Sequence, residues 1–187
     1  LRQDPDVVMV GEIRDLETAQ IAIQASLTGH LVLSTVHTND AAGAVTRLRD
    51  MGVEPFLLAS TVRLILAQRL VRRLCPHCRR PETVDETLAA RVGLPAGATH
   101  FRAQGCGHCN QTGYVGRIGL YEVIRVDDQI RRMISEGASE DDIAAQARRN
   151  GGGALAAEAR ACVSEGLTTV EEALRVSRQD GGQLGEL

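Results

Sequence analysis

Four of the five cysteines in this 187-residue sequence form two C-x-x-C pairs, and this spacing constrains the fold more than any other feature. The four are Cys75, Cys78, Cys106 and Cys109. Each pair turns two thiolates toward one point, and four thiolates suit a tetrahedral Zn²⁺ ion. We therefore expect a fold that brings the two pairs together around a structural metal, because four protein ligands leave no open position for catalysis.

Two other interpretations of these cysteines are unrelated free thiols and a redox-active C-x-x-C motif. The paired spacing disfavours free thiols, and the sequence around the pairs lacks the βαβ context of a thioredoxin-like site. His77 and His108 lie inside the two pairs and are weaker candidates for ligands. Cys162 is expected to be a small, buried core residue. A metal site in place of a disulfide framework is typical of a reducing, cytosolic compartment.

The overall composition narrows the class of protein. Hydrophobic residues make up 43% of the sequence and aromatic residues only 2%, so the core is expected to consist of Leu, Ile, Val and Ala. The net charge of −3 and the few aromatic side chains disfavour a nucleic-acid binder, including a zinc-ribbon binder. No apolar run is long enough to span a membrane. The sequence begins without a methionine and directly before a predicted strand, so we expect a part of a longer protein.

A strand, a helix and a second strand are predicted near the start of the chain. Residues 6–11 and 31–36 are short apolar runs that contain β-branched side chains, which is typical of buried parallel strands. Residues 16–27 carry apolar side chains at helical spacing. This βαβ unit places the carboxyl ends of both strands at one edge of a sheet, where α/β proteins bind ligands. Glu12 and His37 follow the two strands and are therefore expected at that edge.

Further helices and strands follow from apolar spacing, capping residues and glycine stops. Helices are predicted over residues 40–50, 55–68, 85–92, 127–135, 140–149, 155–164 and 170–176. Strands are predicted over residues 69–74 and 120–124, with a turn-rich stretch over 113–119. The predicted N-caps include Asp15, Asn39 or Asp40, Asp127 or Asp128, and Ser139, and Gly29 is predicted to end the first helix.

Glu12 and His37 together indicate chemistry on a phosphate group. A glutamate at a strand end can orient a water molecule for attack on a γ-phosphate, and a nearby histidine can donate a hydrogen bond to that phosphate. The alternative is a surface glutamate and a structural loop histidine, which each residue taken singly favours because neither spacing is diagnostic. Arg14 is open to two interpretations, a phosphate contact or an ion pair with Asp15 or Glu17.

The sequence LRQDPDVVMVGEIRDLETAQIAIQASLTGHLVLSTVHTNDAAGAVTRL resembles the secretion ATPase superfamily, the hexameric motors of type II secretion and type IV pilus assembly. The part VVMVGEIRD is similar to the atypical Walker B box of that family, and GHLVLSTVHTN is similar to its His box. The four cysteines followed by CNQTGYVGRIGLYEV resemble the metal-binding insertion of the type II secretion ATPases and their pilus-assembly relatives. The resemblance extends from residue 1 to about residue 178.

The resemblance implies an α/β fold. The chain would be part of a RecA-like P-loop ATPase core, a parallel sheet flanked by helices, with an inserted tetracysteine zinc-binding module and a C-terminal helical segment. On this interpretation residues 1–74 are the C-terminal half of the ATPase domain, with the Walker B and His boxes. Residues 75–110 are the metal-binding module, 111–178 a mainly helical segment, and 179–187 a flexible tail.

The resemblance also implies roles for single residues. Glu12 would be the catalytic glutamate that positions or activates the attacking water, and His37 would lie near the γ-phosphate. Arg14 and Thr35 would lie in the vicinity of the nucleotide. Cys75, Cys78, Cys106 and Cys109 would hold a structural Zn²⁺ ion. ATP and Mg²⁺ would be the ligands of the full-length protein, with Gly11 at the position of the usual Walker B aspartate.

The P-loop motif G-x-x-x-x-G-K-[S/T] does not occur in these 187 residues. We therefore expect a longer parent protein to hydrolyse ATP and this chain alone to be inactive. The resemblance implies a homohexameric motor that powers pseudopilus assembly and protein export in type II secretion. Its partners would be proteins of the inner-membrane platform, without nucleic acid. It would be cytoplasmic, and peripheral at the inner membrane through these partners.

Two alternative functions remain from the sequence. The first is a type IV pilus assembly ATPase, which shares the two boxes and the tetracysteine module. The second concerns this chain by itself, as a zinc-stabilised interaction module that docks on the inner-membrane platform without chemistry of its own.

Overall fold

The computed structural model describes residues 5–179, and the chain forms two compact units. Within the described residues, unit 1 consists of residues 5–67 and 123–152, and unit 2 of residues 68–122 and 153–179. Each unit thus combines two separate stretches of the chain, whereas the segments predicted from the sequence are contiguous. Two long strands, β3 (Leu64–Leu74) and β6 (Tyr114–Arg125), pair with each other and contribute residues to both units.

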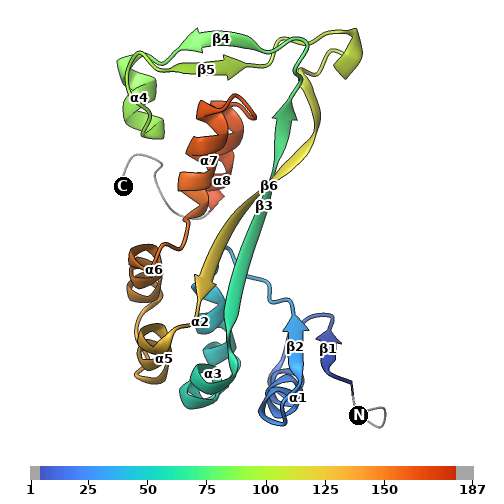
Figure 1. The fold of residues 1–187 in the computed structure, drawn as a ribbon, viewed down its shortest axis with the longest axis vertical. Coiled ribbons are helices and arrows are strands. Elements are labelled where there is room, and N and C mark those ends of the chain that lie inside the picture. Colours follow the sequence, from blue (N-terminus) through green and yellow to red (C-terminus); the bar gives the residue numbers. More distant parts are fainter. Residues whose placement is uncertain (1–4, 180–187) are drawn as a thin grey trace. The chain divides into compact units, whose positions relative to one another are not determined.

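Unit 1 begins with the predicted βαβ arrangement, which the structure confirms. It consists of β1 (Val7–Val10), α1 (Leu16–Leu27) and β2 (Leu31–Ser34) (Figure 1). The two strands are parallel, and their register runs from Val7 opposite Leu31 to Val10 opposite Ser34. The carboxyl ends of both strands therefore lie at the same edge of this small sheet.

Local sequence signals set both ends of α1. The carboxylate of Asp15 accepts a hydrogen bond from the backbone N–H of Thr18 at 2.8 Å, which satisfies one of the free donors of the first turn. At the other end, Gly29 takes a φ of 101°, which turns the chain back toward β2 at a position that a side chain would strain. Both signals were predicted from the sequence.

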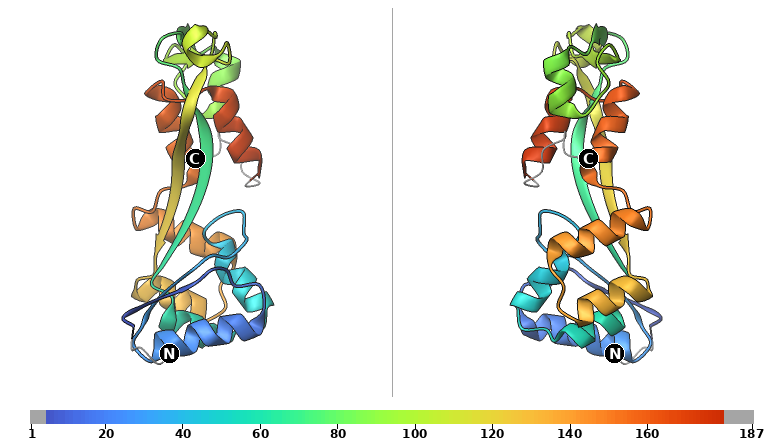
Figure 2. Two further views of the ribbon diagram at one scale, coloured as in Figure 1. Left: turned by 90° about the vertical axis from the view of Figure 1, so that its right-hand side faces the viewer. Right: turned by 90° about the vertical axis from the view of Figure 1, so that its left-hand side faces the viewer.

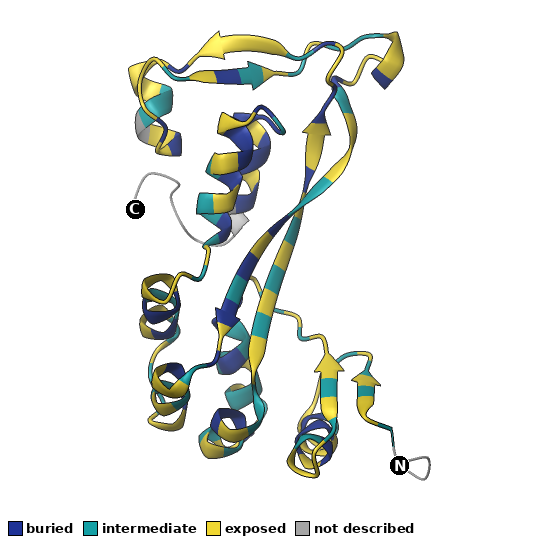
Figure 3. Ribbon diagram, in the orientation of Figure 1, coloured by how far each residue is buried: buried dark blue, intermediate teal, exposed yellow. Residues whose placement is uncertain are grey.

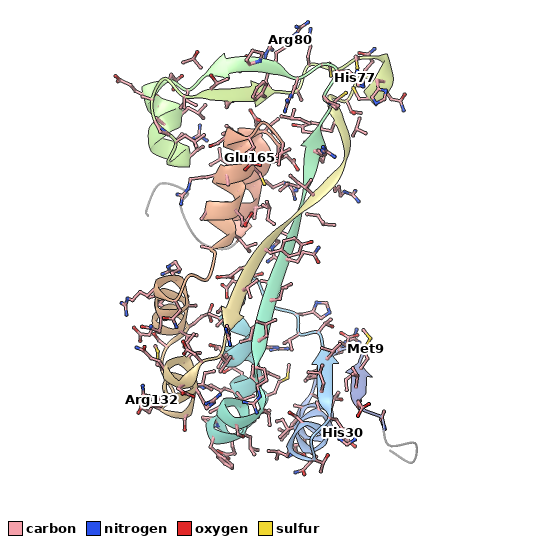
Figure 4. The ribbon with its side chains drawn as sticks, viewed as in Figure 1. Met9, His30, His77, Arg80, Arg132 and Glu165 are labelled. Atoms are coloured by element: carbon pink, nitrogen blue, oxygen red, sulfur yellow. The ribbon has the colours of Figure 1, made fainter. Side chains whose placement is uncertain are left out.

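The two strands are less buried than the sequence predicts. Alternate side chains on one face of the sheet are exposed, with Val7 at 53%, Met9 at 76%, Leu31 at 54% and Leu33 at 51%. Figure 3 colours the exposed positions of both strands yellow, and Figure 4 labels Met9. The other face packs on the core of unit 1 through residues such as Val32. A continuous apolar run is typical of a strand that is covered on both faces. Among residues 5–179, side chains bury one face of this sheet only.

Four further helices complete unit 1: α2 (Gly43–Asp50), α3 (Pro55–Thr61), α5 (Asp128–Ser135) and α6 (Glu140–Arg149). Helix α3 packs against both α1 and α5 (Figure 2). The core is aliphatic, as the composition predicted. Its most buried members are Ala19, Ala41, Ala42, Val45, Leu58, Ile124, Ile130, Ile134 and Ile143.

The prediction of a helix over residues 55–68 is wrong for the second half of this range. Helix α3 ends at Thr61, and the following residue, Val62, has extended backbone angles. Residues 64–67 instead begin β3, where exposed and half-buried side chains alternate. The apolar run is compatible with a helix or a strand, and its pairing with β6 makes it a strand. The sequence pattern could not reveal this pairing, because β6 is distant in the chain.

Helix α2 also starts later than predicted. The side chain of Asp40 accepts a hydrogen bond from the N–H of Gly43 at 2.7 Å, and the helix begins at Gly43, whereas a cap at Asn39 or Asp40 predicts a start at residue 40 or 41. Asp40 therefore organises a loop before the helix, as short acidic side chains commonly do.

Unit 2 contains two short strands that the sequence did not predict. They are β4 (Arg80–Thr83) and β5 (Thr99–Arg102), which form an antiparallel pair. Each has only four residues, in a stretch rich in proline and glycine, so the period-two signal is too short to recognise. The stretch 113–119, predicted as turns, lies largely within β6, where pairing with β3 extends the strand across its glycines.

Three helices complete unit 2: α4 (Glu86–Val92), α7 (Leu155–Ser164) and α8 (Val170–Gln179). Their positions agree with the predicted helices. The buried aliphatic residues of this unit are Val71, Leu74, Val84, Val92, Leu94, Leu120, Leu155, Ala159, Val163, Val170, Ala173 and Val176. The predicted flexible tail, 179–187, lies outside the described residues except for Gln179.

A buried carboxylate joins α8 to β3. Glu172 is 3% exposed and accepts a hydrogen bond from the backbone N–H of Arg72 at 2.8 Å. It also accepts two bonds from the Arg72 guanidinium, at 3.1 and 2.9 Å, and one from Arg175 at 3.2 Å. The same guanidinium lies over the ring of Tyr114, 4.0 Å from its centre. Burial acts to raise the pKa of Glu172, but the bonds from Arg72 and Arg175 outweigh it and lower this pKa.

Backbone conformation and close contacts explain why glycines follow α6. Gly151 takes a φ of 84° just after the end of the helix. A Cβ atom on Gly152 would lie 2.7 Å from the carbonyl oxygen of Ala147 and 2.9 Å from that of Val123. Only glycine allows this close passage of the backbone. Among the residues that the structure describes, no helix is both long and apolar enough to cross a membrane.

Candidate functional site

The carboxyl ends of β1 and β2 are fastened to each other by two hydrogen bonds. The backbone N–H of Ile13 donates to the carbonyl of Thr35 at 2.9 Å, and the hydroxyl of Thr35 donates to the carbonyl of Gly11 at 2.8 Å. The residue between these two contacts is Glu12. Its backbone position is therefore fixed from both sides, with Thr35 as the fastening residue.

The side chains of Arg14 and His37 converge on the carboxylate of Glu12. The Nε of Arg14 lies 2.6 Å from Oε2 of Glu12, and Nε2 of His37 lies 3.2 Å from the same oxygen. The side chain of Glu12 is 31% exposed, whereas those of Arg14 and His37 are 72% and 84% exposed. The three groups thus form an open cluster that a ligand can approach from solvent.

The pKa of Glu12 is lowered, chiefly by the hydrogen bond from Arg14, with a smaller contribution from His37. The carboxylate is therefore ionised at neutral pH. A carboxylate of low basicity accepts a proton reluctantly, but it still accepts hydrogen bonds and orients a water molecule. The cluster is suited to positioning and electrostatic work on an anion.

All four residues predicted for the nucleotide site, Glu12, Arg14, Thr35 and His37, lie at this one edge. Glu12 and His37 come together as the βαβ unit required. The ion pair that the structure shows for Arg14 is with Glu12, whereas the sequence indicated Asp15 or Glu17. Local spacing could not reveal this pair, because it depends on the turn that the chain makes after β1.

The second site is the group of four cysteine thiols in unit 2. The Sγ atoms of Cys75, Cys78, Cys106 and Cys109 all lie within 4.8 Å of one another. Three pairs are separated by 3.9, 3.8 and 3.8 Å. A Zn–S bond of about 2.3 Å in tetrahedral geometry requires Sγ atoms roughly 3.8 Å apart. The thiols therefore have the spacing of a tetrahedral metal site.

Backbone groups prepare this cluster for thiolates. The N–H groups of Cys106 and Gly113 donate to Sγ of Cys109, each at 3.2 Å. Burial acts to raise the pKa of Cys109, but these two donors outweigh it and lower the pKa to about 6. Burial raises the pKa of Cys78 to about 11. One thiolate at neutral pH gives a cation a first ligand, and a bound cation draws the protons from the others.

Gly113 is a residue of this site that the sequence reasoning missed. Besides its N–H bond to Cys109, its carbonyl accepts a hydrogen bond from the N–H of Cys75 at 2.9 Å. Its φ is 77°, and a Cβ atom would lie 2.5 Å from Cβ of Ala103. The signal available in the sequence is a glycine shortly after the last cysteine, where the chain must turn back toward the metal.

The two histidines inside the cysteine pairs lie side by side outside the four-thiol group. The rings of His77, labelled in Figure 4, and His108 have centres 4.3 Å apart, and both residues are exposed. Within residues 5–179, the group of side chains that could hold a metal ion consists of the four cysteines. Cys162 is buried in α7, as predicted.

Comparisons with known proteins give a consistent result. A family model described as "Type II/IV secretion system protein" matches residues 1–175. The "Type II secretion system protein E" of Pseudomonas aeruginosa is 57% identical over 182 residues, which are 96% of this chain and 36% of that protein. The "Type IV pilus assembly ATPase TfpB" of Acinetobacter baylyi is 47% identical over 182 residues, which are 94% of this chain and 31% of that protein.

A solved structure agrees with these relatives. The chain superimposes on the structure titled "Crystal Structure of the Pilus Retraction Motor PilT and Bound ADP" with a TM-score of 0.66 and 26% identity, over 95% of this chain and 41% of that one. The fold is therefore that of the RecA-like secretion ATPases. The chain spans about a third of the length of these two curated relatives.

Proposed function

Because the chain belongs to the type II/IV secretion system protein family, we propose that it is part of an ATPase motor that powers protein export by type II secretion. The observation that carries this proposal is the cluster of Glu12, Arg14 and His37 at the carboxyl ends of two parallel strands. An ionised carboxylate and an imidazole at such an edge suit the hydrolysis of a nucleoside triphosphate.

Glu12 would position the attacking water. Its lowered pKa makes it a poor proton acceptor in the ground state, so its main contribution is to hold the water in line with the γ-phosphate. His37 would donate a hydrogen bond to the phosphate oxygens, on which negative charge gathers. Before a nucleotide binds, the guanidinium of Arg14 would neutralise the charge of Glu12. In the bound state the same guanidinium would contact a phosphate of the nucleotide. The hydroxyl of Thr35 would keep Glu12 in place through Gly11.

ATP and Mg²⁺ are the ligands that this function implies. A carboxylate oxygen of Glu12 would hold a water molecule near Mg²⁺. Arg14 and His37 would bind the phosphates. A backbone cradle and a lysine for the phosphates are further requirements of the chemistry, and no P-loop motif occurs in these 187 residues. We propose that a longer protein supplies them and that this chain alone does not hydrolyse ATP.

Zn²⁺ is the metal that we propose for the cysteine cluster. Four thiolate ligands at tetrahedral spacing favour it over Mg²⁺ and Ca²⁺, which take oxygen ligands. The ion would close two loops of unit 2 and leave no open coordination position, so its contribution would be to stability. Its removal is expected to unfold this part of the unit.

The parent protein would work as a homohexamer with proteins of the inner-membrane platform as partners, and it would drive assembly of a pseudopilus. Its place would be the cytoplasmic face of the inner membrane, peripheral through those partners. These expectations come from the family. A role in type IV pilus assembly is the second candidate, and the Acinetobacter baylyi relative favours it; the higher identity to the type II protein supports secretion.

The direct test is phosphate release by a longer polypeptide that contains this chain, with Glu12→Gln as the variant. We expect ATPase activity to fall by about 100-fold or more while nucleotide binding persists, because the amide cannot orient water as a carboxylate does. Glu17→Gln, an exposed acidic residue in the first turn of α1, is the matched control and should keep full activity.

The same assay on this 187-residue chain should give no release above background. Full activity of Glu12→Gln would refute the role of Glu12. Turnover by the isolated chain at the rate of the longer polypeptide would refute the proposal that the chain is catalytically incomplete. An absence of ATPase activity in every longer polypeptide, together with binding to platform proteins, would favour the interaction module instead.

A further inference from the structure

The turn between α7 and α8, residues 165–169, is fastened to the end of β3. The backbone N–H of Leu74 donates to the carbonyl of Leu167 at 2.8 Å, and the hydroxyl of Thr168 donates to the carbonyl of Arg72 at 2.8 Å. Thr168 is fully buried, so its hydrogen bond is shielded from water. The turn therefore docks on the strand that leads directly into the first cysteine pair.

Arg79 makes a further contact with this turn, from the other side of the first cysteine loop (residues 75–78). Its backbone N–H donates to the carbonyl of Cys75 at 3.1 Å, so Arg79 is held by the loop itself. Its guanidinium donates to the carbonyl of Gly166 at 2.6 Å and lies over the ring of Phe101, 4.7 Å from the ring centre. A charged donor makes a strong hydrogen bond, and the ring supports the flat guanidinium. The side chain thus joins the cysteine loop to the turn after α7.

Gly166 fits closely against the Arg79 side chain. It takes a φ of 67°, and a Cβ atom would lie 2.5 Å from Cδ2 of Phe101 and 2.9 Å from a guanidinium nitrogen of Arg79. A larger residue would have to move the ring or the guanidinium, and its backbone would be strained. The docked turn therefore depends on the direction in which Arg79 projects.

The first cysteine loop sets that direction. A cation with four thiolate ligands would fix both cysteine loops, because each ligand keeps its place in the tetrahedral shell. Without a cation, the thiols contact one another only as weak donors and acceptors, at 3.8 and 3.9 Å. The loop then gains freedom, and Arg79 moves with it because it follows Cys78 directly in the chain.

We propose that metal binding by the four cysteines is coupled to docking of the turn between α7 and α8, with Arg79 as the positioning residue that transmits the coupling. A bound metal holds Arg79 where it meets Gly166, and the docked turn holds the loop in the shape that the metal requires. Coupling of this kind is reciprocal, so each event strengthens the other by the same factor. The identity of the metal rests on the proposed zinc site, whereas the contacts of Arg79 do not.

The test measures two quantities in this 187-residue chain. One is the affinity for Zn²⁺, by competition with a chelator of known affinity. The other is hydrogen exchange at the N–H of Leu167, which donates to the carbonyl of Cys162 at 2.9 Å, with and without Zn²⁺. In the wild type Zn²⁺ should slow this exchange. Arg79→Ala should bind Zn²⁺ about tenfold more weakly, as for the loss of one charged hydrogen bond, and the slowing should shrink by the same factor.

Two further variants make the test specific. Gly166→Ala leaves the cysteine loops unchanged but places a Cβ atom where Phe101 and Arg79 lie, so it should also weaken Zn²⁺ binding. Arg73→Ala is the matched control, because Arg73 is exposed and lies two residues before the first cysteine pair. It removes a positive charge near the metal but none of the contacts with the turn. Its affinity and exchange should stay within about twofold of the wild type.

The outcomes separate the coupling from the metal site. Binding of Zn²⁺ by Arg79→Ala as tightly as by the wild type would overturn the coupling and leave the zinc site intact, as would Leu167 exchange that does not respond to Zn²⁺. A wild type that binds no Zn²⁺ would overturn the zinc site and the coupling with it. If Arg79→Ala does not fold, Arg79→Lys decides, because it keeps the charge but not the flat stacking on Phe101. An affinity equal to that of Arg73→Ala would then overturn the coupling.

Discussion

The buried carboxylate of Glu172 allows a quantitative test of how α8 is held. Glu172→Ala removes four hydrogen bonds, one from the backbone N–H of Arg72 and three from guanidinium groups. Loss of a buried partner in an ion pair costs about 3–5 kcal/mol when the remaining charge stays buried. The side chains of Arg72 and Arg175 are 53% and 49% exposed, so both recover water. We therefore expect a smaller loss, about 2–4 kcal/mol, most of it from the backbone donor.

The assay uses the two tyrosines of the chain. The sequence has no tryptophan, and Tyr114 and Tyr121 both lie in unit 2, so tyrosine fluorescence follows the unfolding of this unit in urea. Glu171→Ala is the matched control, because Glu171 is the exposed neighbour in the same helical turn and loses the same helix-dipole interaction. The control should change the free energy of unfolding by about 0.5 kcal/mol or less.

The pH dependence of the difference adds a second criterion. The pKa of Glu172 is lowered from its ordinary value of 4.5, so the carboxylate stabilises the fold above that pH. This contribution is lost as the pH falls through the lowered pKa, and the two variants should then converge. A loss in Glu172→Ala no larger than in Glu171→Ala at neutral pH, or a difference that is independent of pH, would refute this reasoning.

Three further predictions concern the metal, a glycine and a helix cap. Elemental analysis of the purified chain should find one zinc ion per molecule. The Cys109→Ser variant should lose this ion, and the control Cys162→Ser should keep it. A metal-free wild type in which all five thiols react with a thiol reagent would contradict the site. Gly152→Ala should lower the free energy of unfolding by about 1–3 kcal/mol, because its Cβ would lie 2.7 Å from a carbonyl oxygen, and equal stability of the variant would refute the steric argument. Asp15→Ala should speed hydrogen exchange in α1 by the equivalent of about 1 kcal/mol, and Glu17→Ala, which caps nothing, should change it less.

The sequence by itself determined those features that depend on neighbouring residues. Helix α6 begins after Ser139 as predicted, because the hydroxyl of Ser139 bonds to the backbone of the helix that it starts. The parallel pairing of β1 and β2 also followed from the sequence, since a short βαβ unit has few alternatives. The convergence of the two C-x-x-C pairs also followed from the sequence, because each pair supplies only two of the four ligands that a tetrahedral metal site requires.

The tertiary structure decided whatever depends on partners that are distant in the chain. Residues 64–67 could have continued a helix, and the pairing of β3 with β6 makes them a strand. Arg14 pairs with Glu12, and Arg49 donates a hydrogen bond to the carbonyl of Ala138 across unit 1, because packing and turns bring these groups together. Local pattern specifies local hydrogen bonds, but the pKa values and contacts of a site arise from charges and burial that only the folded chain assembles.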